Sequence, residues 1–258
     1  MKPDVPVLSF EHLDIGYGHH IVARDLHGQL MAGTVTALAG TNGAGKSTLL
    51  RTLAALQRPL GGHIRYGDRD AANMDRQAMA RTVSVVLTAR PPAGGLTVRE
   101  VAELGRTPYT GFTGRLTHRD RDIANRALTL VGAAALADRP LASLSDGERQ
   151  RVMVAKALAQ QTPAILLDEP TAFLDFGSKA AMLRLLCRLA REEGKAVLLS
   201  THDLELAFRL VGNLWLLAPT GFTSGPVSAL AADGTIAALF DAPGVRFDPT
   251  TRRFDIDA

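Results

Sequence analysis

The stretch Gly40-Thr41-Asn42-Gly43-Ala44-Gly45-Lys46-Ser47-Thr48 decides the fold of this chain. It follows a short apolar run, residues 35–39, and precedes a leucine-rich segment. Glycines let the backbone bend tightly so that successive N–H groups point inward, and the following helix turns its positive dipole end toward an anion. All nine residues are therefore candidate ligands of a polyphosphate. We expect Lys46 to reach the β- and γ-phosphates, and the hydroxyl of Ser47 to bind a Mg²⁺ ion that bridges them.

An ordinary glycine-rich turn between a strand and a helix is the alternative interpretation. The spacing Gly-x4-Gly-Lys-Ser, set between an apolar run and a helical pattern, favours the phosphate site. Leu49, Leu50, Leu53 and Leu56 recur at helical spacing after the loop, and Arg58-Pro59 is expected to stop the helix. The stretch therefore predicts a strand, a loop and a helix in that order.

The composition is that of one globular unit rather than of a disordered or membrane-spanning chain. The 258 residues are 46% hydrophobic and 21% charged. No apolar run approaches the roughly 20 residues that a spanning helix needs, and the first six residues lead into no secretory apolar core, so we expect a cytosolic location. The single cysteine, Cys187, excludes an intrachain disulfide, and its leucine neighbours indicate helix core rather than a catalytic thiol.

The positive charge is concentrated in one segment. Between Thr88 and Arg126 there are seven arginines and four acidic residues, a surplus that equals the net charge of +3 of the whole chain. This segment is either an ordinary solvated face or a surface that contacts a membrane-side partner or anionic headgroups.

Tyr17 lies where a predicted strand turns ahead of the phosphate loop. Residues 7–18 contain β-formers and end at Gly16-Tyr17-Gly18, which predicts a strand and a turn. The tyrosine either packs at the end of this strand or stacks on a nucleotide base, since any base offers a π-face.

The rest of the chain alternates between apolar strand patterns and helical patterns. Residues 91–95, Pro-Pro-Ala-Gly-Gly, predict a flexible joint, and an inserted helical subdomain is expected from residue 89 to residue 161. The remaining predicted elements are a turn and a short strand over 60–67, a helix at 76–81, a strand at 83–87, helices at 97–104, 119–131 and 177–193, strands at 196–200 and 213–218, a helix at 235–240, and a hairpin pairing 245–247 with 254–256.

The last helix of the expected subdomain opens with Leu144-Ser145-Asp146-Gly147-Glu148-Arg149-Gln150. Ser145 and Asp146 are both good N-caps, worth roughly 1 kcal/mol, and this explains the pattern without any ligand. A free hydroxyl and a glycine at a helix N-terminus can also form a second anion site. The residues alone favour capping.

Two carboxylates close the apolar strand Ala164-Ile165-Leu166-Leu167. Unpaired carboxylates are costly to bury, but beside a phosphate loop they have a chemical use. We expect Asp168 to hold the hydration shell of Mg²⁺ and Glu169 to accept a proton from the attacking water. The strand at 196–200 delivers His202 to the same sheet edge, where it could touch the γ-phosphate.

Together and in order, these motifs resemble the nucleotide-binding subunit of ATP-binding cassette transporters. The resemblance covers nearly the whole chain, and its most specific part is the helix-opening Leu-Ser-x-Gly shortly before the acidic strand. It implies an α/β fold of the P-loop NTPase class. In that fold a RecA-like core sheet and an N-terminal antiparallel β subdomain occupy 1–88 and 162–220, the helical subdomain 89–161, and a C-terminal tail 221–258.

The resemblance also implies the partners and the nucleotide. Two copies would associate head to tail, each holding Mg²⁺-ATP between one phosphate loop and the other copy's Ser145, Gly147 and Glu148, with Asp175 contacting the opposite copy and Tyr17 stacking on adenine. His202 and Lys46 would assist Glu169 in hydrolysis. The dimer would sit on the cytoplasmic face of the membrane against two transmembrane permease subunits, and indirectly serve a periplasmic or surface substrate-binding protein.

Within this family, the segments 104–109 and 144–150 look most like importers of iron-siderophore, haem or cobalamin complexes. Thr41 replaces a usual proline, and Asp146 and Glu148 replace a glycine and a glutamine. Thr88 stands where the family has a glutamine that reaches the metal. The threonine hydroxyl is about 2.5 Å shorter in reach by ordinary bond lengths, so we expect a water molecule to bridge Thr88 to Mg²⁺.

Two other function classes fit part of the pattern. One is a soluble cassette ATPase acting on nucleic acid or ribosomes, which usually carries two cassettes or a long coiled-coil insertion. The other is a nucleotide-binding regulator with little turnover, suggested by Thr88. We expect an importer subunit that binds no nucleic acid.

Overall fold

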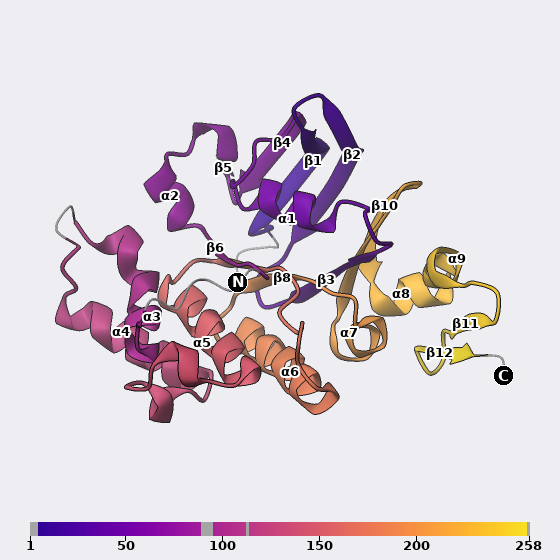
Figure 1. The fold of residues 1–258 in the computed structure, drawn as a ribbon. Helices are drawn as coiled ribbons and strands as arrows, with labels where there is room; N and C mark the ends of the chain where they lie inside the picture. The colour runs from indigo at the N-terminus through magenta and orange to yellow at the C-terminus, as the bar shows by residue number, and fades with distance from the viewer. Residues whose placement is uncertain (1–4, 89–94, 112–113, 257–258) are drawn as a thin grey trace.

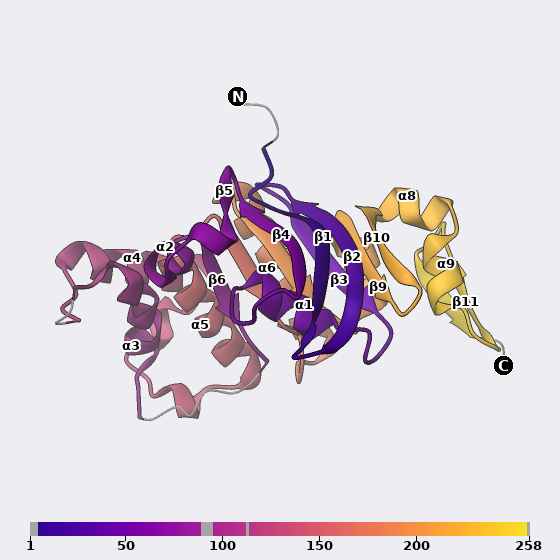
Figure 2. The same ribbon diagram turned by 90° about the horizontal axis from the view of Figure 1, so that it is seen from above.

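A computed structural model describes residues 5–88, 95–111 and 114–256 of the chain, and Figures 1 and 2 show it in two views. An antiparallel sheet near the N-terminus has the order β2-β1-β4-β5. Its strands are β1 (Leu8–Tyr17), β2 (His20–Leu30), β4 (Gly61–Tyr66) and β5 (Arg69–Asp70).

The central sheet has six strands in the order β10-β9-β3-β8-β7-β6. All neighbours pair in parallel except β10, which is antiparallel to β9. The sheet strands are β3 (Val35–Gly40), β6 (Val83–Val86), β7 (Ala164–Leu167), β8 (Ala196–Ser200), β9 (Asn213–Ala218) and β10 (Gly221–Pro226).

Both faces of this sheet are buried. Successive side chains of a strand point to opposite faces, so each strand contributes side chains to two cores. In β7, Ala164 and Leu166 join the core shared with α1 (Lys46–Leu53) and the antiparallel sheet. Ile165 and Leu167 join the core on the other side. Continuous apolar strands at 164–167 and 196–200 are thus explained by a sheet covered on both sides, and the predicted α/β fold is confirmed.

Helices cover the second face and extend to one end of the molecule. In Figure 1, α5, α6 and α7 lie along the sheet on the side away from β1 and β2, and α3 and α4 extend beyond α5. The helices other than α1 are α2 (Arg76–Ala80), α3 (Val98–Glu103), α4 (His118–Leu130), α5 (Asp146–Ala159), α6 (Phe176–Glu192), α7 (Leu204–Leu210), α8 (Val227–Ala232) and α9 (Thr235–Phe240). Short 3-10 helices occur at Ala71–Asn73, Leu104–Tyr109, Ala134–Leu136 and Leu141–Ser143. No helix within the described residues combines the length and apolar character needed to cross a bilayer.

The C-terminal part packs beside β9 and β10. The predicted strand at 213–218 and helix at 235–240 agree with β9 and α9, and the predicted hairpin is formed by β11 (Val245–Asp248) and β12 (Arg253–Ile256). Phe208 of α7 contacts Phe240, Phe247 and Phe254, with ring centroids 5.4 to 6.3 Å apart. An aromatic cluster therefore attaches this part to the core.

Several expectations need correction. The helix after the phosphate loop ends at Leu53, because Ala55 adopts a left-handed conformation (φ 55°), and Leu56 is 59% exposed rather than part of the apolar face. The strand pattern also missed β2 and β10, whose residues alternate poorly. The helical pattern missed α7 and α8, which have only seven and six residues. The predicted joint at 91–95 falls, apart from Gly95, outside the described residues.

Three arginines of the basic segment, Arg99, Arg106 and Arg126, form ion pairs with acidic side chains. Arg106, only 4% exposed, donates from Nε to Asp120 Oδ1 at 2.9 Å and from a terminal nitrogen to the carbonyl of Ala159 at 2.7 Å. Hydrogen bonds from Thr117 and then from Arg106 lower the pKa of Asp120 to about 2. Arg99 and Arg126 also form ion pairs with acidic residues. Part of the basic segment is therefore paired within the protein rather than wholly solvated or facing a partner.

Candidate active site

The phosphate loop begins where β3 ends, and its glycines are required by close packing. A Cβ at Gly40 would lie 1.9 Å from the carbonyl oxygen of Leu217 on β9, so no larger residue fits there. Gly45 has φ 102° and is the N-cap of α1, without a side-chain cap on the helix. The first N–H groups of α1 are thus left for a ligand, as expected for an anion site.

Lys46 is held inside this loop. Its side chain is buried, and Nζ donates to the carbonyl oxygens of Gly40 at 3.0 Å and Thr41 at 3.1 Å. Burial lowers the pKa of the ammonium, while the nearby charges of Glu169 and Asp168 raise it. The loop therefore surrounds a positive charge that faces two carboxylates.

Asp168 joins three segments at the end of β7. Its Oδ1 accepts hydrogen bonds from the hydroxyls of Ser200 at 2.8 Å and Ser47 at 3.3 Å, and the residue is 7% exposed. The phosphate loop, β7 and β8 thus meet at one carboxylate oxygen. Sequence reasoning missed Ser200, although its place at the end of an apolar strand was a usable signal.

Glu169 adopts a strained backbone conformation beside this junction. Its φ is 50°, in the left-handed region that residues with a Cβ rarely occupy, and its N–H donates to Ser200 Oγ at 2.9 Å. Its Oε1 lies 3.0 Å from Nε2 of His202. The structure therefore brings together two predicted site residues that the sequence had not paired.

A second set of contacts holds the segment that carries His202. Asp203 accepts a hydrogen bond from Thr171 Oγ1 at 2.8 Å and pairs with Lys179 Nζ at 2.6 Å. Its N–H donates to Thr201 Oγ1 at 2.9 Å. Sequence reasoning missed the roles of Thr171 and Lys179, because both lie on segments remote in the chain from His202.

Tyr17 lies at the end of β1 above the start of α1. Its hydroxyl is 3.0 Å from Thr48 Oγ1, while the residue remains 49% exposed. An exposed ring anchored next to the phosphate loop is placed suitably for contact with a base.

Thr88 has a protein partner. Its hydroxyl donates to the backbone carbonyl of Asp168 at 2.9 Å, which ties the segment after β6 to the end of β7. The oxygen keeps lone pairs that can accept from a water molecule, so the predicted water bridge to a metal stays a prediction.

Ser145 and Glu148 form a reciprocal capping box at the start of α5. Ser145 Oγ accepts from the N–H of Glu148 at 3.3 Å, and Glu148 Oε2 accepts from the N–H of Ser145 at 2.9 Å. The N–H of Ser145 and then its hydroxyl donate to the Glu148 carboxylate and lower the pKa of that group. The acidic residue that departs from the family pattern is thus used to cap its own helix.

Gly147 and Asp175 lie close to one another in the fold. A Cβ at Gly147 would be 3.8 Å from Leu174 Cδ2, just ahead of Asp175, which caps α6 by accepting from Ser178. Phe173 and Phe176 flank this turn and are 71% and 70% exposed. Sequence reasoning missed this exposed aromatic pair.

In this parallel sheet a glycine-rich loop connects one strand to a helix, and two carboxylates at the end of another strand lie beside that loop. This arrangement defines a P-loop nucleotide hydrolase. Comparison with known proteins narrows this class. The ABC transporter family model matches residues 23–172. The chain belongs to the ABC transporter family and is an ATP-binding ATPase.

Relatives and solved structures agree with this assignment. The iron(3+)-hydroxamate import ATP-binding protein FhuC of Bacillus subtilis is 40% identical over 202 residues, which cover 78% of this chain and 75% of FhuC. An inward-facing metal-chelate type ABC transporter is 28% identical with a TM-score of 0.80, covering 91% of this chain and 89% of that one. The dimeric bacterial ABC transporter cassette MJ0796 is 25% identical with a TM-score of 0.71, covering 85% and 98% of the two chains.

We predict that Thr88→Val lowers ATP turnover by roughly tenfold or less, because one hydroxyl-to-carbonyl hydrogen bond beside Asp168 is lost. Thr88→Gln should be tolerated. Steady-state phosphate release measures both. Thr82→Val is the matched control, because it removes a similar bond, to the carbonyl of Ala78, away from the site. A loss above about a hundredfold for Thr88→Val, with Thr82→Val unaffected, would show that Thr88 does more than hold this strand end.

Proposed function

We propose that this chain is the energy-coupling subunit of an importer for metal-chelate complexes of the iron-siderophore, haem or cobalamin type. The observation that carries the ATPase part is the junction at Asp168, where Ser47 and Ser200 converge beside the Glu169–His202 pair. The importer part is supported by the likeness to FhuC and to the metal-chelate transporter.

We assign roles to the residues around the junction. Mg²⁺ would be held by Ser47 and Asp168, with Thr88 acting through water, and the fit is good because hydroxyl and carboxylate oxygens are the ligands Mg²⁺ prefers. Lys46 and the loop N–H groups would bind the phosphates. The metal supplies charge neutralisation at the phosphoryl oxygens when bound.

Glu169 is the proposed general base. A carboxylate can accept the proton of an attacking water within hydrogen-bond reach. His202 lies 3.0 Å from Glu169 Oε1, so its imidazole can orient the carboxylate and contact the γ-phosphate. The strained backbone of Glu169 fixes the direction in which the carboxylate projects.

The working unit is proposed to be a head-to-tail dimer on the cytoplasmic face of the membrane, against two permease subunits and, through them, a substrate-binding protein. Ser145, Gly147 and Asp175 would meet the other copy's nucleotide or its phosphate loop. The exposed Phe173 and Phe176 beside Asp175 support a contact surface there, since large exposed apolar groups often mark interfaces. The likeness to a dimeric cassette supports the same assembly.

We divide the chain accordingly. Residues 1–88 and 162–220 bind nucleotide, residues 89–161 form the arm that presents Ser145, and residues 221–258 form a tail packed on α7 through the phenylalanine cluster. Two features favour an importer subunit over a nucleic-acid ATPase. Arg99 and Arg106 of the arm are paired with acidic residues of the arm, and the arm carries no long coiled-coil pattern.

Glu169→Gln is expected to keep ATP binding and to lower hydrolysis by at least a hundredfold, because the amide keeps the shape but cannot accept a proton. Fluorescent-nucleotide binding and phosphate release measure the two properties separately, and gel filtration with ATP should show a dimer accumulating. Glu192→Gln, on the exposed surface of α6, is the control. Hydrolysis within about threefold of the parent chain would remove Glu169 from the role of general base.

Ser145→Ala should lose much more ATPase activity than stability. Loss of the cap alone costs about 1 kcal/mol of unfolding free energy. Thr97→Ala is a matched control, because Thr97 forms the same capping box with Glu100 on the same arm. Urea unfolding should show similar losses for both variants, and turnover should fall only in Ser145→Ala. Equal turnover in the two variants would refute a role for Ser145 at the other copy's nucleotide.

The transport role predicts a cellular phenotype. Cells lacking the gene should lose uptake of an iron(3+)-hydroxamate complex, haem or cobalamin, and the wild-type gene but not Lys46→Ala should restore it. The chain should also sediment with membranes. Normal uptake of all three complexes by the deletion strain, with ATPase activity intact in the purified chain, would exclude the proposed substrate class while leaving the ATPase assignment in place.

A further inference from the structure

Three register shifts interrupt the pairing of β1 with β2, and the first two, between Phe10 and Ile15, lie next to each other. The pairs Phe10 with Gly28 and Leu13 with Leu26 leave two β1 residues, one of them His12, opposite the single residue His27. The extra residue in each bulge bends its strand and re-aims a side chain.

The second bulge lies on β2. Leu13 pairs with Leu26 and Ile15 with Ala23, so two β2 residues, one of them Asp25, stand opposite Asp14. His12 has φ 50° and Asp25 has φ 53°, both in the left-handed region. Histidine and aspartate tolerate this region better than most residues, but it remains uncommon for side chains with a Cβ. The two strained positions lie next to each other.

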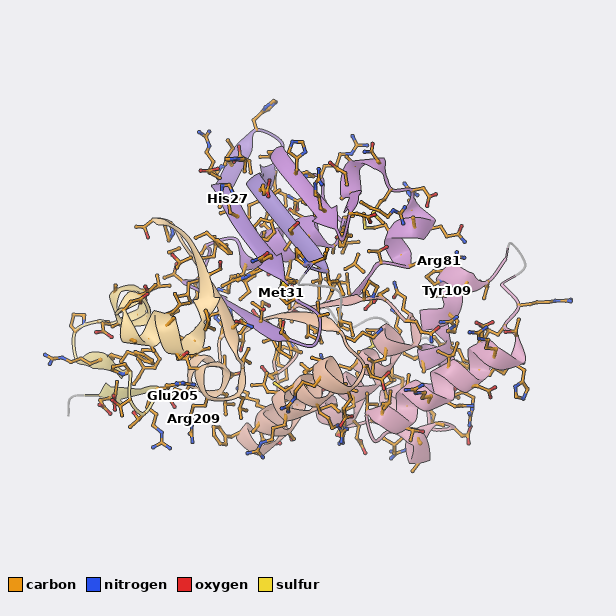
Figure 3. The ribbon with its side chains drawn as sticks, turned by 180° about the vertical axis from the view of Figure 1, so that it is seen from behind. His27, Met31, Arg81, Tyr109, Glu205 and Arg209 are labelled. Carbon is orange, nitrogen blue, oxygen red and sulfur yellow. The ribbon has the colours of Figure 1, made fainter. Side chains whose placement is uncertain are left out.

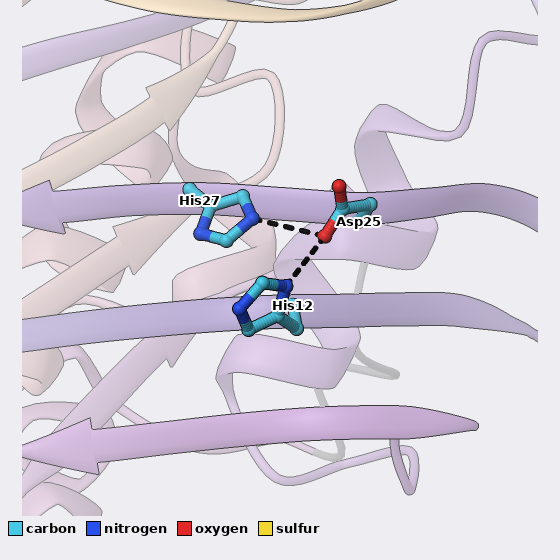
Figure 4. A group of neighbouring side chains, drawn as sticks. All are labelled: His12, Asp25 and His27. Atoms are coloured by element: carbon cyan, nitrogen blue, oxygen red, sulfur yellow. Dashed lines mark hydrogen bonds and ion pairs between the residues drawn. The ribbon is translucent and has the colours of Figure 1, made fainter.

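The bulges bring three polar side chains to one point. Asp25 Oδ1 lies 2.8 Å from Nδ1 of His12 and 2.9 Å from Nε2 of His27 (Figure 4). The three ligand atoms are all within 4.8 Å of one another. The imidazole rings meet edge to face, with centroids 4.5 Å apart.

We propose that His12, Asp25 and His27 form a surface site for a divalent transition-metal ion, with Zn²⁺ as the best-fitting ion. Two imidazole nitrogens and one carboxylate oxygen make a donor set that such ions bind well, whereas Mg²⁺ and Ca²⁺ prefer oxygen ligands. Each neutral imidazole can carry its proton on the other ring nitrogen, which leaves the nitrogen facing Asp25 free to ligate.

The geometry is close to what the ion needs. Zinc bonds near 2.0–2.1 Å at tetrahedral angles put neighbouring ligand atoms about 3.3 Å apart, so the contacts of 2.8 and 2.9 Å must open by roughly half an ångström. The side chains of His12, Asp25 and His27 are 75%, 72% and 47% exposed, and can make this adjustment. Water would complete the coordination shell.

The surroundings support the site. Asp14 Oδ1 accepts the N–H of Asp25 at 2.9 Å and so holds the strained backbone that aims the carboxylate. Outer contacts of this kind orient metal ligands in many proteins. His12 precedes Tyr17 by five positions of β1, about 16 Å at the usual rise of a strand, so the ion would join β1 to β2 without touching the nucleotide.

Zinc binding to the full-length chain, without a polyhistidine tag and without nucleotide, tests the proposal. Isothermal titration with ZnCl₂ should give one equivalent per chain, and Zn²⁺ should raise the thermal midpoint. The double variant His12→Asn, His27→Gln should bind at least tenfold more weakly and lose the shift in midpoint. Asparagine is chosen at position 12 because it tolerates the left-handed conformation.

Two controls separate this site from other histidines. His202→Gln removes the histidine beside Glu169, and His118→Gln removes a single exposed histidine paired with Asp122. Both should keep full zinc affinity. Electron paramagnetic resonance with Cu²⁺ as the probe should report two nitrogen ligands, and none in the double variant. Zinc affinity that is unchanged in the double variant, or lost in His202→Gln, would overturn the proposal.

Discussion

The convergence of two serine hydroxyls on Asp168 is the constraint on which the active site depends. Ser47 comes from the phosphate loop and Ser200 from the end of β8, and both donate to Oδ1 of the carboxylate at the end of β7. Ser200 also accepts the N–H of Glu169, so one hydroxyl positions both carboxylates. A buried charge requires such partners, and here they come from the segments that must surround a nucleotide.

The central sheet makes this convergence possible. Parallel strands deliver their carboxyl ends to one edge, and a ligand site at that edge is the general expectation for open α/β sheets. At Gly40 the end of β3 lies so close to β9 that no side chain would fit between them. This close approach determines where the phosphate loop begins. The antiparallel sheet and α1 cover one face of the central sheet, and α5 to α7 cover the other, so the edge is rigid on both sides.

The helical arm has its own internal order. Arg106 connects Asp120 of α4 to the C-terminal end of α5, and stacks on Tyr109, whose ring also contacts Arg81 (Figure 3). The buried guanidinium holds α4 and α5 together through charge-assisted hydrogen bonds. Gln77 and Arg81, which precede β6, donate hydrogen bonds to the carbonyl of Pro108 and fix the arm to that segment. The helix that begins at Ser145 is thereby held in a defined direction relative to the nucleotide-binding core.

The sequence by itself determined the phosphate loop, the acidic strand end, the capped helix and the family, because each depends on residues close together in the chain. It also predicted most helices and buried strands, but not β2 or β10, whose residues alternate poorly, nor the early end of α1 at Leu53.

Only the tertiary structure decided that Glu169 contacts His202 and that Thr88 donates a hydrogen bond to the carbonyl of Asp168. It also decided that two bulges bring together His12, Asp25 and His27. Such contacts depend on strand register and backbone conformation, which side-chain patterns do not specify.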